Sequence, residues 1–236
     1  MSWLQHYIRS SIGKKQLMAI TGIGLVGFLF AHLAGNLTIF AGRDAINSYA
    51  QSLVDLGPLL WVARGGLIFM VLLHIWAGIT LAMHNRASRP VNYKRFKSNK
   101  STFYGRLMIW SGVLLLVYIG YHLAHFTLGL VQPELHALVE QANGGVVVSS
   151  FNERHDVYGM VVGGFQNAFI VALYVTAMLG LSMHVAHAIP SFFQTLGFSH
   201  PKYKDAIRVA GPAIAILMFI GYASIPLAVL FGVIKP

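Results

Sequence analysis

Histidine is the residue type whose number and positions in this sequence point most directly to chemistry. The chain has 11 histidines but only 7 Asp and Glu in total. Six histidines lie in or directly after long apolar stretches: His32, His74, His122, His125, His184 and His187. Ionisable side chains in such segments are costly and mark candidate functional sites. The stretches contain no Asp or Glu, which excludes a carboxylate-rich di-iron centre, whereas neutral imidazole suits haem iron ligated from both sides.

The positions of four of these histidines along their stretches predict how they pair. With a rise of about 1.5 Å per helical residue, His32 lies about 26 Å and His122 about 24 Å from the basic residues that precede their stretches. We therefore expect these two to hold one haem, nearer the outer side. His74 lies about 18 Å before the basic residues that follow it, and His184 lies about 42 Å beyond Asp156, toward the inner side. We expect this second pair to hold a second haem.

Two neighbouring histidines leave this assignment open. His125 follows His122 by three residues and His187 follows His184 by three, so each shares a helix face with the histidine it follows. Spacing alone does not choose within either set. A histidine in a membrane span also often serves only as an interhelical hydrogen-bonding group, but four of them on four stretches at two depths favour a cofactor site.

Five apolar stretches must position these histidines, and each is long enough to cross a bilayer, which takes about 20 residues. Hydrophobic residues make up 56% of the 236-residue chain and charged residues only 10%, which excludes a soluble two-domain enzyme and a disordered or fibrous chain. The alternation typical of a membrane barrel is absent. We predict an all-α membrane protein with one five-helix bundle over residues 1–236. Its spans are expected at 16–40, 59–83, 107–131, 158–187 and 209–234, with a short helix at Pro133–Ala142.

The distribution of Lys and Arg predicts the orientation of this bundle. Of the 17 basic residues, 13 lie in the N-terminal segment and in the connections after the second and fourth spans, whereas six of the seven acids lie on the other side. Basic residues concentrate on the cytoplasmic side of membranes, so we expect a cytoplasmic N-terminus and an outer C-terminus. The net charge of +10 then reflects this orientation, and no nucleic-acid partner is expected. The basic connection 85–105 either faces anionic membrane lipid or forms a docking surface for a soluble partner. The absence of cysteine excludes an iron–sulfur cluster in this chain.

Several short segments, in their order and spacing, resemble a known family. They are Ser11–Lys15, His32–Asn36, His74–Gly78, Tyr121–Leu123, Met183–His184 and Ser191–Gly197. The chain resembles the cytochrome b membrane-anchor subunit of succinate:quinone oxidoreductases, which comprise succinate dehydrogenases and fumarate reductases. The resemblance is to the single-subunit, five-helix, two-haem type, and it covers nearly the whole chain.

The resemblance implies a function in electron transfer. It implies two haem b groups, with His32 and His122 as ligands of the outer haem iron and His74 and His184 as ligands of the inner one. It also implies a flavoprotein subunit and an iron–sulfur subunit bound on the cytoplasmic face. Electrons would pass between the succinate/fumarate site on a partner chain and a membrane quinone, either menaquinone or ubiquinone. The expected location is the inner (cytoplasmic) membrane, which the chain crosses several times.

The quinone site is expected near the outer haem, where the resemblance implies an acid close to the start of the second span. Asp55 matches that position best and is the candidate for proton exchange with the quinone. The alternative is that Asp55 only caps the second span ahead of Pro58. Two other functions stay open: a di-haem anchor of a different respiratory oxidoreductase, and a haem-free transporter whose histidines line a proton path.

Overall fold

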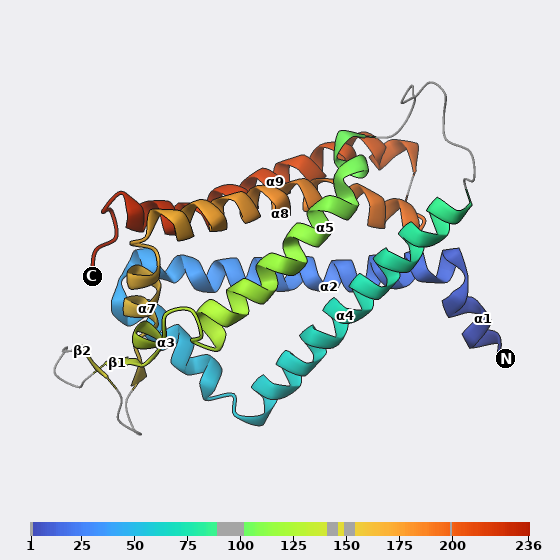
Figure 1. The fold of residues 1–236 in the computed structure, drawn as a ribbon. Helices are drawn as coiled ribbons and strands as arrows, with labels where there is room; N and C mark the ends of the chain where they lie inside the picture. The colour runs from blue at the N-terminus through green and yellow to red at the C-terminus, as the bar shows by residue number, and fades with distance from the viewer. Residues whose placement is uncertain (1, 89–101, 141–145, 149–153, 199) are drawn as a thin grey trace. The chain divides into compact units, whose positions relative to one another are not determined.

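Five long helices dominate the chain. The computed structural model describes residues 2–88, 102–140, 146–148, 154–198 and 200–236 (Figure 1). Within these residues, five helices are long and apolar enough to cross a membrane, which confirms the predicted number of spans. They are α2 (Ser11–Leu37), α4 (Pro58–Ala87), α5 (Phe103–His122), α8 (Ala168–Thr195) and α9 (Pro201–Leu230). The chain is therefore a predominantly α-helical membrane protein.

Shorter elements connect or extend these helices. The helical ones are α1 (Trp3–Arg9), a 3-10 turn (Thr38–Ala41), α3 (Arg43–Val54), a π-turn (Leu123–Thr127), α6 (Pro133–His136) and α7 (Val157–Gly164). The described strands are β1 (Leu138–Glu140), β2 (Val146–Val148) and β3 (Arg154–His155). They form an antiparallel sheet in the order β2-β1-β3, in which Leu138 faces Val148 and Val139 faces His155.

Two sequence-based predictions of element boundaries are wrong. The fourth span does not begin at residue 158, because α7 ends at Gly164 and the chain turns before α8 begins at Ala168. Asn167 stabilises that turn, since its side-chain oxygen accepts a hydrogen bond from the backbone N–H of Phe169 at 2.9 Å. The short helix expected at Pro133–Ala142 ends at His136, because the residues that follow pair as β1 with two strands that come later in the chain.

The chain divides into two compact units. Unit 1 comprises residues 1–29, 64–113 and 181–217, and unit 2 comprises residues 30–63, 114–180 and 218–236. In unit 1 many of the buried positions are small, among them Ala19, Ala77, Ala186 and Ala215. Small residues allow membrane helices to approach closely. Gly211 of α9 shows this directly, since a Cβ there would lie 2.7 Å from the carbonyl oxygen of Ala186 in α8.

Unit 2 has a larger apolar core that includes the short elements. Its buried members are Ile39, Ile46, Val161, Val162, Phe165, Ile170, Val171, Tyr174, Ile225, Val229 and Ile234. These residues come from the 3-10 turn, α3, α7, α8 and α9, and from the segments that directly follow α7 and α9. Helix α3 contacts α7 and β3, and α7 also contacts α6 and β1. The short elements that the sequence did not predict are therefore packed parts of unit 2.

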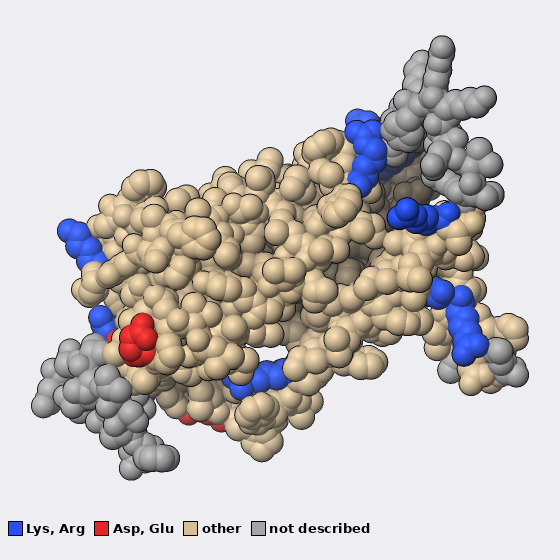
Figure 2. All heavy atoms as spheres, in the orientation of Figure 1, with Lys and Arg blue, Asp and Glu red and all other residues tan. Residues whose placement is uncertain are grey.

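Charged residues are distributed unequally between the units. The described Lys and Arg of unit 1 are Arg9, Lys14, Lys15, Arg64, Arg86, Arg106, Lys202, Lys204 and Arg208, and its described acid is Asp205. In unit 2 the described acids are Asp44, Asp55, Glu134, Glu140 and Asp156, with Arg43, Arg154 and Lys235 as the described basic residues. Figure 2 shows acidic side chains over the elements of unit 2, whereas most of the basic side chains in view lie over elements of unit 1.

Candidate functional site

His74 of α4 and His184 of α8 form a facing pair in unit 1. The centres of their rings are 6.3 Å apart, and the ring planes are inclined by 59°. Both side chains are half-buried. A Cβ at Gly22 of α2 would lie 3.4 Å from Cε1 of His74, so the absence of a side chain there leaves room for the imidazole.

Hydroxyl groups fix the orientation of both rings in this pair. Nδ1 of His74 lies 3.2 Å from Oγ1 of Thr21, and Nδ1 of His184 lies 3.1 Å from Oγ of Ser111. The hydroxyl of Thr21 donates its proton to the carbonyl of Leu17, 2.7 Å away, and the hydroxyl of Ser111 donates its proton to the carbonyl of Met108, 3.1 Å away. Each hydroxyl must therefore accept from the N–H at Nδ1 of its histidine. This tautomer leaves the lone pair on Nε2, the state in which imidazole binds a metal.

His32 of α2 and His122 of α5 form the equivalent pair in unit 2. Their ring centres are 5.9 Å apart, and the planes are nearly perpendicular at 82°. Among the described residues, Nδ1 of His122 is buried without a hydrogen-bond partner. Such a group costs about 1–3 kcal/mol when left unpaired.

His125 does not join this pair, although it lies three residues after His122. Its Nε2 lies 2.7 Å from Oε1 of Gln132, and its Nδ1 lies 2.9 Å from the hydroxyl of Tyr174. Both ring nitrogens are thus occupied by the protein, and the residue is only 2% exposed. The π-turn begins directly after His122, and it holds more residues per turn than an α-helix, so His125 is turned away from the face that His122 presents. These contacts make His125 a buried hydrogen-bonding residue.

His187 likewise lies apart from the facing rings of unit 1. Its Nδ1 lies 3.4 Å from Oγ1 of Thr102, just before α5 begins. A Cβ at Gly105 would come within 2.9 Å of its ring, so His187 packs against the first turn of α5. His184 is therefore the residue of α8 whose ring faces His74.

Aromatic side chains enclose the pair in unit 2. Tyr118 stacks on His122 with ring centres 5.8 Å apart, and Phe126 and Tyr174 meet the same ring edge-on at 5.9 and 6.1 Å. Tyr222 of α9 lies 6.2 Å from the ring of His32. The two pairs therefore have different surroundings: hydroxyl groups hold the rings in unit 1, and aromatic rings surround the pair in unit 2.

The spacing within each pair would allow the two imidazoles to hold one haem iron between them. A metal–imidazole bond is about 2 Å long and the ring centre lies about 1.1 Å beyond the nitrogen, so two imidazoles that share one iron would have ring centres about 6.2 Å apart. The observed separations are 5.9 and 6.3 Å. Two histidines suffice for such a site. The part of the chain that the structure describes holds no group of three or more His, Cys, Asp or Glu arranged for a bare metal ion.

Known proteins provide no relative from which to infer a role for these pairs. The chain matches no protein-family model, no curated protein and no solved structure.

Asp55, the residue predicted to exchange protons with a quinone, lies at the end of α3 in unit 2. It directly follows α3, where its backbone N–H donates to the carbonyl of Gln51. Its exposed carboxylate accepts a hydrogen bond from the side chain of Gln51 at 2.9 Å. Asp55 therefore ends the preceding helix, a helix that the sequence did not predict, instead of capping the second span. Its role toward a quinone stays a prediction.

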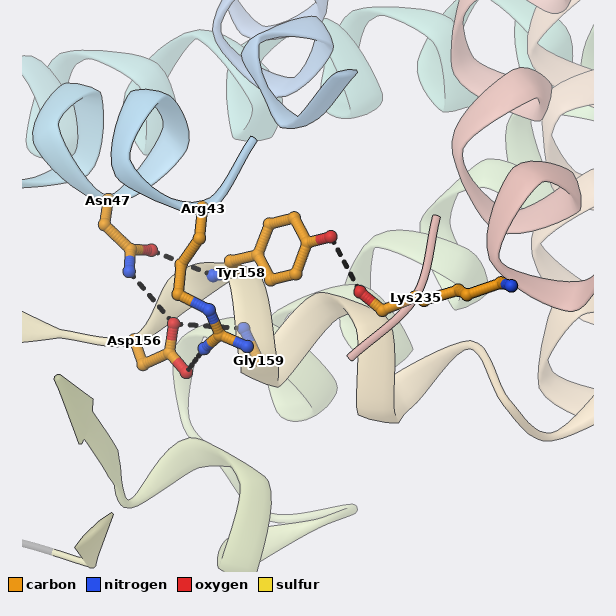
Figure 3. Close-up of polar contacts among 6 residues, drawn as sticks. All are labelled: Arg43, Asn47, Asp156, Tyr158, Gly159 and Lys235. Atoms are coloured by element: carbon orange, nitrogen blue, oxygen red, sulfur yellow. Dashed lines mark hydrogen bonds and ion pairs between the residues drawn. The ribbon is translucent and has the colours of Figure 1, made fainter. Parts of the chain in front are cut away.

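A buried carboxylate that the sequence did not single out joins α3 to α7 (Figure 3). Asp156 is 0% exposed and precedes α7, where it accepts a hydrogen bond from the backbone N–H of Gly159 at 3.1 Å. It also accepts one from Asn47 at 2.9 Å and forms an ion pair with Arg43. The guanidinium of Arg43 lies over the ring of Tyr158, 4.8 Å from its centre. This cluster fixes the short elements of unit 2 to one another.

Proposed function

We propose that the chain is a membrane-bound cytochrome b that holds two haems and transfers electrons. The observation that carries this proposal is the presence of two separate histidine pairs, each from two membrane-span helices, with ring centres 5.9 and 6.3 Å apart. Two imidazoles without acidic neighbours are the ligand set of a low-spin haem. When bound, each haem supplies one-electron redox chemistry.

In this proposal the residues of the chain hold and orient the two groups. His74 and His184 hold the inner haem, and Thr21 and Ser111 keep their Nε2 lone pairs available. His32 and His122 hold the outer haem among the aromatic rings of unit 2. The apolar helices exclude water from both sites, and the resulting low dielectric contributes to the haem potentials.

We further propose that the chain anchors a succinate dehydrogenase or fumarate reductase. A flavoprotein and an iron–sulfur subunit would bind at its cytoplasmic side, and a membrane quinone would react near the outer haem, with Asp55 exchanging protons. The resemblance in sequence supports this proposal, as does the predominance of basic residues in unit 1, which suits an acidic docking surface. Purification of the chain from its native membrane would test it, since a flavin-bearing subunit and an iron–sulfur subunit should accompany the chain.

The haem proposal is tested by spectra of the purified protein. Reduction with dithionite should produce a b-type spectrum, and extracted haem should amount to two per chain. His122→Ala and His184→Ala should each retain one haem, and the spectra of the two variants should differ because each keeps a different site. His187→Ala serves as the matched control for His184→Ala, because it removes an imidazole one turn away that does not face His74.

Other results would favour the alternative functions. A purified chain without haem, together with histidine-dependent proton flux in vesicles, would support a transporter. Two haems together with soluble partners that lack flavin would support an anchor of another respiratory oxidoreductase. Retention of both haems by His122→Ala would refute the ligand assignment itself.

A further inference from the structure

The two histidine pairs differ in what holds their rings. In unit 1, hydrogen bonds from Thr21 and Ser111 fix His74 and His184 directly. In unit 2, Nδ1 of His122 has no hydrogen-bond partner among the described residues. Packing must therefore set the orientation of His122.

Three aromatic rings provide that packing, and two of them are tied to His125. Tyr174 meets the ring of His122 at 6.1 Å and also hydrogen-bonds Nδ1 of His125. Phe126 meets the ring of His122 at 5.9 Å and stacks on His125 with ring centres only 3.9 Å apart. The third ring, Tyr118, contacts Tyr174 edge-on at 5.3 Å. Tyr174 and Phe126 thus contact both His122 and His125, and Tyr118 is linked to His125 through Tyr174.

The hydrogen bonds around His125 have only one consistent direction. Oε1 of Gln132 is an acceptor, so the proton of His125 must lie on Nε2 and point to Gln132. Nδ1 then carries the lone pair, and the hydroxyl of Tyr174 must donate to it. His125 is therefore held on both sides, with a donor on α8 and an acceptor in the segment before α6.

Local backbone geometry gives His125 this position. The π-turn Leu123–Thr127 closes with a hydrogen bond from the N–H of Leu128 to the carbonyl of Leu123 at 2.8 Å. π-turns within helices occur frequently at functional sites. Gly164 of α7 completes the enclosure, since a Cβ there would lie 3.2 Å from Nε2 of His125 and 3.3 Å from Phe126.

We propose that the chain of hydrogen bonds Tyr174–His125–Gln132 positions His122 opposite His32 and so sets the angle between the two ligand planes of the outer haem. His125 is a positioning residue in this arrangement, because it acts through Tyr174 and Phe126. The inference rests on the proposed haem function. It predicts that the outer haem is sensitive to Tyr174 and Gln132, although both hydrogen-bond His125 and not His122 or His32.

Tyr174→Phe is the sharpest test, because it removes the hydroxyl and keeps the ring that packs on His122. The matched control is Tyr121→Phe, whose ring also lies beside His125, at 5.7 Å, but whose hydroxyl has no free nitrogen on His125 to bond. A second variant, Gln132→Met, removes the acceptor at the other end of the chain with a side chain of similar length. The protein is purified with its full chain and its haem.

Electron paramagnetic resonance of the oxidised haems provides the measurement, because the g values of a low-spin haem depend on the orientation of its axial ligands. His122→Ala and His184→Ala assign the two signals. We expect Tyr174→Phe and Gln132→Met to shift the largest g value of the outer haem or to lose that haem. The inner signal should be unchanged, and Tyr121→Phe should match the wild type.

The outcomes separate this inference from the function on which it rests. A wild-type protein without haem refutes both. Two haems in every variant with an unchanged outer signal refute the positioning role alone. Equal shifts of both signals, or a shift in Tyr121→Phe as large as that in Tyr174→Phe, also overturn it, because a general loosening of the bundle would then explain the effect.

Discussion

Ser111→Ala tests most directly how the pair His74 and His184 would be prepared for the proposed haem. The hydroxyl of Ser111 lies 3.1 Å from Nδ1 of His184, and Ser111 is only 4% exposed, so water does not readily replace it. An unpaired buried N–H costs about 1–3 kcal/mol. Loss of such a supporting group lowers metal affinity by about 10- to 100-fold. A factor of ten in affinity corresponds to about 1.4 kcal/mol, so the loss of affinity agrees in size with the cost of the unpaired N–H.

The expected result is a selective weakening of the haem proposed at His74 and His184. Reduced protein is mixed with an excess of a soluble haem acceptor, and haem loss is followed by absorbance. We expect Ser111→Ala to lower the affinity for the haem proposed at His74 and His184 by about 10- to 100-fold, while the haem proposed at His32 and His122 behaves as in the wild type. Ser111→Thr retains a hydroxyl and should recover much of the affinity.

Ser182→Ala is the matched control for this experiment. Ser182 also lies in unit 1, but its hydroxyl donates to the carbonyl of Ala215 at 3.1 Å and not to a histidine. Haem loss from this variant should equal that of the wild type. If Ser111→Ala also loses haem at the wild-type rate, or if both alanine variants weaken the haem equally, the argument that the hydroxyl sets the tautomer of His184 is refuted.

Three further predictions concern unit 2. Asp156→Asn should lower the free energy of unfolding by about 3 kcal/mol, which denaturant titration would measure. This value is at the low end for a broken buried ion pair, because the side chain of Arg43 is 28% exposed. Burial lowers the pKa of His155 below 6.5, and the neighbouring imidazole of His136 lowers it further. The unfolded chain therefore takes up a proton first as pH falls, so stability should decrease below about pH 6.5, level off below the folded-state pKa, and depend less on pH in His155→Gln. Gly164→Ala should displace the ring of His125 by a few tenths of an ångström and shift the spectrum of the outer haem alone.

Each of these predictions has a clear contrary result. Asp44 is the control for the ion pair, because its side chain is 87% exposed and Asp44→Asn should cost less than about 1 kcal/mol. Equal destabilisation by both Asn variants would contradict the role assigned to Asp156. A pH dependence that is the same in the wild type and in His155→Gln would contradict the role of His155. An inner-haem shift in Gly164→Ala would show that the strain spreads beyond the contacts of Gly164.

The sequence predicted the elements whose signals are local. An apolar stretch of about 20 residues has few alternatives to a membrane helix, because lipid offers its backbone no hydrogen-bonding partner. The five spans followed from this constraint, and so did the positions of four histidines within them. Elements outside the spans were missed for the converse reason. Helix α3 has a mixed polar sequence, and β1 exists only because it pairs with strands that come later in the chain.

The choice between neighbouring histidines depended on tertiary structure. By helical spacing, His122 and His125 share a face and are equivalent. The π-turn and the hydrogen bonds to Tyr174 and Gln132 make them different: one ring faces His32 with an unpaired nitrogen, and the other is held on both sides. The sequence by itself thus determined which residue type sits inside the spans and on which helices. Only the packing of the tertiary structure decided which imidazole faces a second histidine. Hydrogen-bond partners from other segments of the chain occupy both ring nitrogens of His125, whereas the ring of His122 faces His32.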